Sequence, residues 1–195
     1  MAVKPGITLE DIISVSIDIA DQHGVSEISL STVSKKLGIR SPSLYNHVNG
    51  LSGLKAALAH YGTKRLYEAM ADAAIGKSGE DAIYATTTAY IDFARNNPGL
   101  YEAVSIAVKL DSDVVQKEAD KILQLMVRLL RTFHLPEDLL VHQVRILRAF
   151  LHGFVTIEQD KGFGIPLDVD ESLQIGLDTI IAGIKSKSNQ TEERE

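Results

Sequence analysis

The chain has 195 residues and a formal net charge of −6 at pH 7, with 45% hydrophobic and 24% charged residues. This composition excludes a disordered chain and indicates one or two globular domains of ordinary size. The chain has no cysteine, which excludes disulfide frameworks, thiolate metal sites and cysteine nucleophiles. An acidic protein is at first sight a poor partner for nucleic acid, because two negative surfaces repel each other.

The charge is unevenly distributed along the chain. Residues 28–67 contain six Lys or Arg and no Asp or Glu, although the chain as a whole is acidic. This carboxylate-free segment is where a polyanionic partner is expected to bind. The N-terminus has no apolar signal region, and no apolar run reaches the roughly 18 residues of a membrane span, so we expect a cytoplasmic protein.

Apolar residues recur with helical spacing from end to end, which predicts an all-α fold of about nine helices. The expected helices span residues 8–21, 29–37, 41–48, 50–75, 80–95, 97–107, 112–133, 136–159 and 169–185.

Capping residues mark the start of the first helix. Thr8 and Asp11 form a capping arrangement, with Asp where Glu is more usual. The spacing of Ile13, Ile17 and Ala20 gives this helix its expected buried face.

The next two helices are short. Ser29 can cap the second helix, which Gly38 ends. Ser41 is expected to cap the third helix, with Pro42 at its first position, where the missing N–H has no cost. Their expected inward side chains are Leu30, Val33, Leu37, Leu44 and Val48.

These two helices form a helix-turn-helix over residues 29–48, in which the second helix presents polar side chains to base edges. An α-helical wheel turns Ser31, Thr32, Lys35, Lys36, Pro42, Ser43, Tyr45 and Asn46 outward. The alternative is a solvated corner of an all-α protein. The serine cap, the early proline, the paired lysines and the absence of carboxylates favour DNA.

The order Gly38, Pro42, Leu44, Tyr45, His47 resembles the recognition segment of the TetR family of bacterial repressors. The similarity extends over much of the N-terminal third of the chain, and further on only the helical layout and length match. The resemblance implies a homodimer with a DNA-binding head and a larger C-terminal domain that holds a small-molecule pocket.

The resemblance also assigns roles to residues of the head. Bases or nearby backbone would be contacted by Ser31, Ser41, Pro42, Ser43 and Tyr45, and phosphates by Asn46 and His47. Leu51 stands where the family commonly has a phosphate-clamping lysine, and Lys55 is the expected substitute. The full predicted DNA-binding set is Ser31, Thr32, Lys35, Arg40, Ser41, Pro42, Ser43, Tyr45, Asn46, His47 and Lys55.

Four segments are expected along the chain. A helix-turn-helix DNA-binding domain spans residues 1–50, a connecting helix 51–75, an effector-binding and dimerisation domain 76–185, and a flexible tail 186–195.

The last two expected helices, at 136–159 and 169–185, are apolar on more than one side. We expect them to pair with their symmetry mates as a four-helix dimer interface, the alternative being a monomer core. The middle helices contain several aromatic residues and a methionine, which predict a mostly apolar ligand. His152 is the first choice for a polar side chain that anchors it. The candidate ligand residues are Tyr90, Phe93, Tyr101, Met126, Phe150, His152 and Phe154.

Enzymatic patterns are weak. Ser52 and Lys55 fit an S-x-x-K pattern without its companion motifs, and the histidines lack metal-ligand spacing. No catalytic residue, metal or cofactor is therefore expected. The sequence predicts a repressor that small molecules release from a palindromic operator on double-stranded DNA. The alternatives are an all-α enzyme with an apolar pocket and an interaction adaptor that does not bind DNA.

Overall fold

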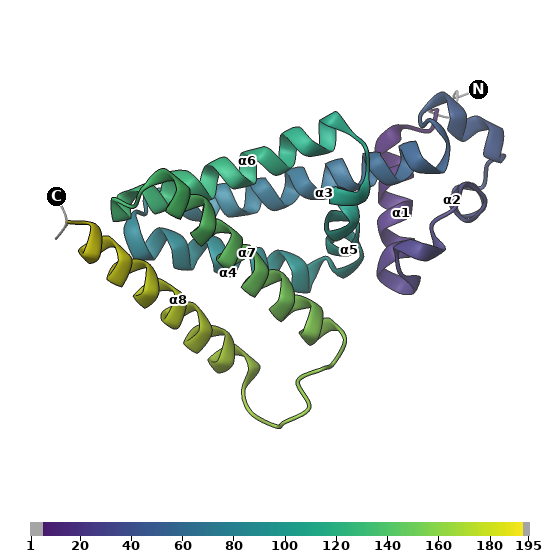
Figure 1. The fold of residues 1–195 in the computed structure, drawn as a ribbon. Helices are drawn as coiled ribbons and strands as arrows, with labels where there is room; N and C mark the ends of the chain where they lie inside the picture. The colour runs from purple at the N-terminus through teal and green to yellow at the C-terminus, as the bar shows by residue number, and fades with distance from the viewer. Residues whose placement is uncertain (1–5, 193–195) are drawn as a thin grey trace. The chain divides into compact units, whose positions relative to one another are not determined.

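The computed structural model describes residues 6–192, apart from the side chains of 108 and 189–192. Over this part the chain forms eight α-helices, four short 3-10 helices and no strand, which confirms the all-α class (Figure 1). The elements are α1 Leu9–His23, η1 Val25–Glu27, α2 Leu30–Leu37, η2 Ser41–Asn46, α3 Gly50–Ala74, α4 Gly79–Asn96, α5 Pro98–Ile106, η3 Ala107–Lys109, α6 Asp113–Leu130, η4 Arg131–Phe133, α7 Glu137–Gln159 and α8 Val169–Glu192. The nine expected helices correspond to the eight α-helices and η2. None of the described helices is long and apolar enough to cross a membrane.

The chain divides into two compact units. The first unit comprises residues 1–66 and 96–119, and the second unit residues 67–95 and 120–195. The first unit therefore combines the helix-turn-helix with α5, which the expected segments had grouped with the effector domain. The functional domain boundaries stay a prediction.

Local capping in α1 and α2 is as expected. The Asp11 N–H donates to Thr8 Oγ1 and the Thr8 N–H donates to Asp11 Oδ2, at 3.2 and 2.8 Å. These bonds from Thr8 lower the pKa of Asp11. Ser29 and Thr32 form a second capping box, and Gly38 ends α2 at φ 68° in the left-handed region.

The buried face of α1 is broader than the expected one. Ile17 is only half-buried, whereas the neighbouring turns bury residues on both sides of it. The buried side chains of α1 are Ile12, Ile13, Ser16, Ile19 and Ala20. The prediction of Ile17 as a core residue was wrong because the face of α1 that packs on α2, α5 and η1 is centred near Ser16, which leaves Ile17 at its edge.

The contact of α5 with α1 is close at one glycine. A Cβ on Gly99 would lie 2.5 Å from the carbonyl carbon of Ala20. The Gly99 N–H donates to Asp21 Oδ1 at 2.8 Å, and the Val25 N–H donates to Glu102 Oε2 at 2.8 Å. The head and α5 are thus joined by two carboxylates that accept backbone N–H groups from the opposite segment.

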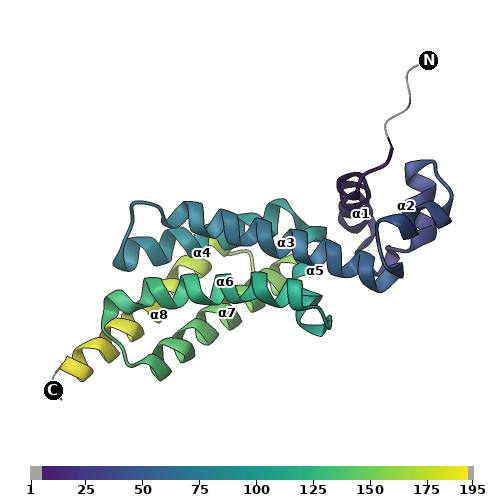
Figure 2. The same cartoon turned by 90° about the horizontal axis from the view of Figure 1, so that it is seen from above.

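In the second unit α7 and α8 lie side by side, joined by the loop at residues 160–168 (Figure 2). The predicted apolar stripe of α7 is buried: Leu140, Val144, Leu147, Leu151, Phe154 and Val155. The helix α8 continues to Glu192, so residues 186–192 of the expected flexible tail are helical. Ile184 is fully buried and Ser188 Oγ donates to the Phe133 carbonyl at 2.6 Å, which ties this last stretch to the unit.

Candidate functional site

The recognition element differs from its prediction in helix type. Residues 41–46 form a 3-10 helix rather than an α-helix, with i to i+3 hydrogen bonds such as Ser43 N–H to the Arg40 carbonyl at 2.9 Å. Ser41 is not the N-cap, which is Arg40 without a side-chain bond. Instead, Ser41 Oγ shares a 2.8 Å hydrogen bond with Ser34 Oγ on α2. That contact fixes Ser41 between the two helices, where its hydroxyl cannot cap its own helix.

Two apolar side chains hold the recognition element in place, as expected. Leu44 is fully buried and Val48 is 5% exposed. A 3-10 helix repeats every three residues, so Pro42 and Tyr45 share one exposed face. Tyr45 is 60% exposed, the orientation that a side chain needs to reach DNA.

The predicted DNA-binding residues all lie in the first unit, and most are exposed there. Exposed members are Ser31, Thr32, Lys35, Arg40, Pro42, Ser43, Tyr45, Asn46 and His47, and half-buried ones are Ser41 and Lys55. Thr32 also has a structural role. Its hydroxyl accepts a hydrogen bond from the Ser29 N–H at 2.9 Å and lies 3.0 Å from the Glu27 carbonyl oxygen. Thr32 is therefore part of the α2 cap, whatever it contributes to DNA.

The two adjacent lysines of α2 differ in their surroundings. Lys36 Nζ lies 3.4 Å from Asp18 Oδ2 on α1, so part of its charge is neutralised within the head. Lys35 and Arg40 are exposed and make no ion pair within residues 6–192. These two charges are the ones positioned to meet phosphates.

The candidate ligand residues fall in both units. Phe93, Met126 and Phe154 are buried in the second unit, whereas Tyr101 is buried in the first. His152 is exposed on α7, so it does not line the buried interior, and its role as a polar anchor stays a prediction.

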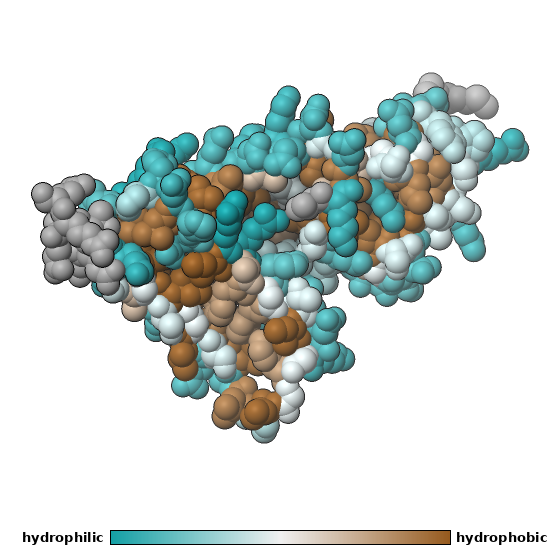
Figure 3. Space-filling view, in the orientation of Figure 1, coloured by the Kyte–Doolittle hydropathy of each residue, from teal (hydrophilic) through white to brown (hydrophobic). Residues whose placement is uncertain are grey.

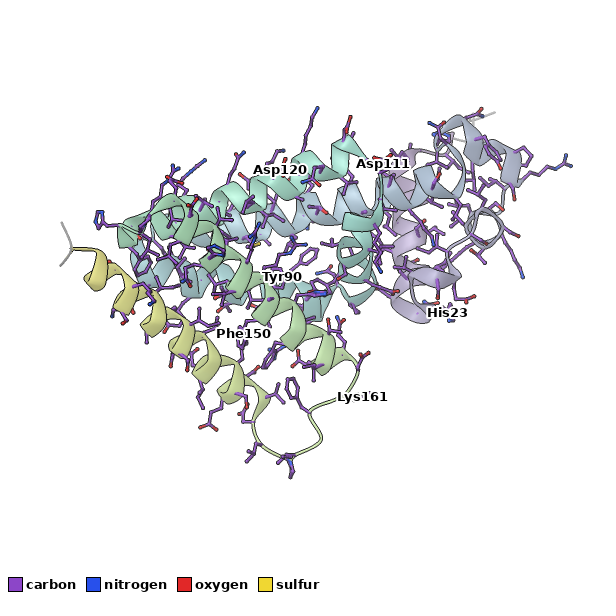
Figure 4. The ribbon with its side chains drawn as sticks, viewed as in Figure 1. His23, Tyr90, Asp111, Asp120, Phe150 and Lys161 are labelled. Atoms are coloured by element: carbon purple, nitrogen blue, oxygen red, sulfur yellow. The ribbon has the colours of Figure 1, made fainter. Side chains whose placement is uncertain are left out.

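Two of the candidates lie together beside the loop after α7. The ring centroids of Phe150 and Phe154 are 6.0 Å apart, and those of Phe154 and Phe163 are 4.9 Å apart. Phe150 points from α7 toward α8, where a Cβ on Gly176 would lie 2.3 Å from its ring (Figure 4). These three rings pack between α7, the loop after it and α8.

A buried polar group that the sequence did not single out is Thr86 on α4. Its side chain is fully buried and its Oγ1 has no hydrogen-bond partner. Buried helical threonines usually bond the carbonyl four residues earlier, as Thr87 does with Ile83 and Thr63 does with Ala59, each at 2.8 Å. No sequence pattern separates Thr86 from Thr87, because the two are adjacent threonines in the same helix.

The orphan hydroxyl gives a direct prediction. Thr86→Val removes a buried unsatisfied group and keeps the shape, so we expect it to raise the free energy of unfolding by about 1 kcal/mol. Thr87→Val removes the hydrogen bond to the Ile83 carbonyl, so it should lower the free energy of unfolding instead. Urea denaturation of both variants checks the pair, and a lower stability for Thr86→Val would contradict the assignment.

The structure also defines an open groove of about 540 Å³ on α4 and the end of α3. It is lined by Ala73, Lys77, Asp81, Tyr84, Ala85, Thr88, Ala89 and Asp92, and none of the candidate ligand residues contributes to it. No group of three or more metal-ligating side chains occurs among the described residues.

Comparison with known proteins identifies the chain. The tetracyclin repressor-like C-terminal domain family matches residues 83–180. The chain is 37% identical over 185 residues to the uncharacterized HTH-type transcriptional regulator YobS of Bacillus subtilis (strain 168), a match that covers 94% of this chain and 96% of that protein.

Solved structures share the fold. A protein of unknown function from Rhodococcus sp. RHA1 superposes with a TM-score of 0.81 at 20% identity, covering 94% of this chain and 98% of that one. BioQ with its natural double-stranded DNA operator gives a TM-score of 0.69 at 16% identity, covering 93% and 99%. The family match over the C-terminal half and the relative matched over almost its whole length lead to one conclusion: this chain belongs to the TetR family of helix-turn-helix transcriptional regulators.

Proposed function

We propose that the protein is a homodimeric repressor that binds a pseudo-palindromic operator in the cytoplasm and releases it when a small, mostly apolar effector enters the second unit. The observation that carries the proposal is the exposed, carboxylate-free surface of α2 and η2, on which Tyr45, Lys35 and Arg40 are free to meet DNA. BioQ, which has the same fold, binds its operator as double-stranded DNA, and this supports the same role for the head.

The mechanism requires two states that differ in the separation of the two heads. The half-sites read by a two-fold dimer lie about 34–36 Å apart or at multiples of that distance. A small rotation of the heads therefore disrupts the contacts with both half-sites at once. An effector that favours the released state by about 1–3 kcal/mol would lower operator affinity 5- to 150-fold.

The outward faces of α7 and α8 support the homodimer. The exposed face of α7 follows a helical stripe of His142, Ile146, Ala149 and Ile157, with the half-buried Gly153 among them, opposite its buried stripe. On α8, Leu177, Ile181 and Ile184 are buried within the unit, while the outward face carries Ile175, Thr179 and Ala182. Apolar and small side chains on adjacent outward faces suit close packing of helices in a two-fold interface. Hydrophobic side chains reach the surface over this region (Figure 3).

The test of DNA binding uses the DNA that flanks the protein's own gene. Tyr45→Ala should weaken specific binding by about 1–3 kcal/mol, and Lys35→Ala should reduce the slope of log affinity against log salt by about 1. Lys117→Ala, which removes an exposed charge from α6, is the matched control. Footprinting and gel-shift titrations at several salt concentrations measure both effects. Unchanged affinity in both head variants would overturn the assignment of the recognition surface.

Simple experiments distinguish the repressor from the interaction adaptor and the all-α enzyme. Failure to shift any flanking DNA at low salt would favour the interaction adaptor. Turnover of a substrate would favour the all-α enzyme, whereas we propose that the protein has no catalytic activity and needs no cofactor. If His152→Ala leaves effector response and stability unchanged, His152 is not the polar anchor.

A further inference from the structure

We propose that the loop at residues 161–167, here called the arm, is a fixed apolar element that packs on a second copy of this chain. The inference rests on the homodimer proposed above and adds to it a contact that the two helices alone do not supply. The chain outside the arm places no other loop with a comparable set of exposed hydrophobic side chains among its described residues.

Both ends of the arm are held by one arginine. Arg95, at the end of α4, donates to both carboxylate oxygens of Glu158, at 2.9 and 2.7 Å, and to Asp170 Oδ1. Glu158 lies just before the arm and Asp170 just after it, so the clamp fixes the separation of its two ends. Hydrogen bonds to Glu158 and Asp170 raise the pKa of Arg95 above its usual range, so its guanidinium stays charged.

Contacts within the arm and with α7 hold the arm in place. The Gly162 N–H donates to the Ile157 carbonyl and the Leu167 N–H donates to the Ile165 carbonyl, each at 2.8 Å. Phe163 packs its ring against Phe154 of α7. These contacts lower the conformational entropy that the arm would lose on binding, which favours a preformed surface.

The tip of the arm is apolar and exposed. Ile165 is 73% exposed, Leu167 is 72% exposed and Phe163 is 37% exposed. An ordered loop that presents large hydrophobic side chains to water indicates a contact surface. The side chains at the end of the loop are coloured as hydrophobic in Figure 3.

Continuity with the outward faces of α7 and α8 identifies the occupant as a second copy. Ile157, 45% exposed, ends the stripe of α7 directly before the arm, and Ile175, 59% exposed, lies on α8 after it. The outward flanks carry opposite charges: Arg145 on α7 and Glu171 at the start of α8 make no ion pair within residues 6–192. A surface that is apolar along its centre and carries both charges can complement itself, as a two-fold interface requires.

The charges beside the arm disfavour an anionic membrane as the occupant. Asp160, Asp168 and Asp170 flank it, with Lys161 the one basic residue in the segment. Membrane-surface loops instead combine apolar tips with clustered basic residues.

The first experiment measures self-association of the full chain by sedimentation. The double variant I165D/L167D should weaken the dimer at least tenfold in Kd, with unchanged helicity by circular dichroism. The control is Ile75→Asp, which alters a side chain of equal exposure (74%) at the end of α3 and should leave Kd unchanged. Ala149→Glu, in the α7 stripe, tests the dimer independently of the arm.

The second experiment uses the absence of cysteine from the chain. Ile165→Cys labelled with an environment-sensitive dye should show a blue shift as the concentration passes through the dimer Kd, and the same label at Ile75→Cys should not. Suppose that Ala149→Glu dissociates the dimer, whereas I165D/L167D leaves it intact and the dye shows no shift. That result would reject the arm as a dimer contact and leave the homodimer in place. A wild-type chain that sediments as a monomer would overturn both.

Discussion

Replacing Gly99 by alanine is expected to destabilise the protein by about 3 kcal/mol, because the added methyl group would meet backbone rather than a mobile side chain. The Cβ would lie 2.5 Å from the carbonyl carbon of Ala20, 2.5 Å from the amide nitrogen of Asp21 and 2.6 Å from the Ala20 Cβ. Real Cβ contacts do not approach this distance, so α5 and α1 would have to separate.

The separation would also break the hydrogen bonds that join the two segments. The Gly99 N–H to Asp21 bond and the Val25 N–H to Glu102 bond both depend on the present spacing of α1 and α5. Since α1 packs on α2 and α2 packs on η2, we expect operator affinity to fall together with stability.

Denaturation by urea at a fixed protein concentration measures the change, since unfolding of an oligomer depends on concentration. Gly183→Ala is the matched control, because nothing lies within 4 Å of a Cβ at that helical position. It should leave stability unchanged or raise it by about 0.5–1 kcal/mol, as expected for Gly to Ala in a helix. A Gly99→Ala protein as stable as the wild type would show that α1 and α5 are not packed as described.

The features that the sequence predicted correctly are those set by residues a few positions apart. The Thr8–Asp11 cap and the cap at Ser29 form from contacts within one helical turn, so spacing alone predicts them. The buried stripe of α7 likewise follows from the 3.6-residue period.

The features that the sequence missed depend on contacts between distant segments. Ser41 is held by Ser34 across the turn, which an isolated cap pattern cannot reveal, and the result is a 3-10 helix where an α-helix was expected. The proximity of Gly99 to Ala20 and the orphan hydroxyl of Thr86 are tertiary facts of the same kind. For the ligand site, the sequence shows which residue types are present but not which way their side chains point. It therefore grouped the exposed His152 with the buried Phe93.

Replacing Leu44 by alanine is expected to impair DNA recognition although its side chain is fully buried and does not itself face DNA. Leu44 is fully buried and is the one buried residue of η2, so it anchors a six-residue element that carries Tyr45. A buried Leu to Ala change costs about 2–5 kcal/mol. Because η2 is short and its other side chains are exposed or half-buried, this cost falls on the local stability of the recognition element.

We therefore expect operator affinity to fall by about 30-fold or more, since each 1.4 kcal/mol corresponds to a factor of about ten. Leu123→Ala, which truncates a side chain that is 41% exposed on α6, should leave affinity unchanged. Because Leu44 lies in the first unit and α7 and α8 lie in the second, self-association should be retained. Gel-shift titration and sedimentation of the same preparation separate the two readouts. An affinity loss that is accompanied by dissociation would mean that the damage spreads beyond η2, and an unchanged affinity would show that the element holds its form without this anchor.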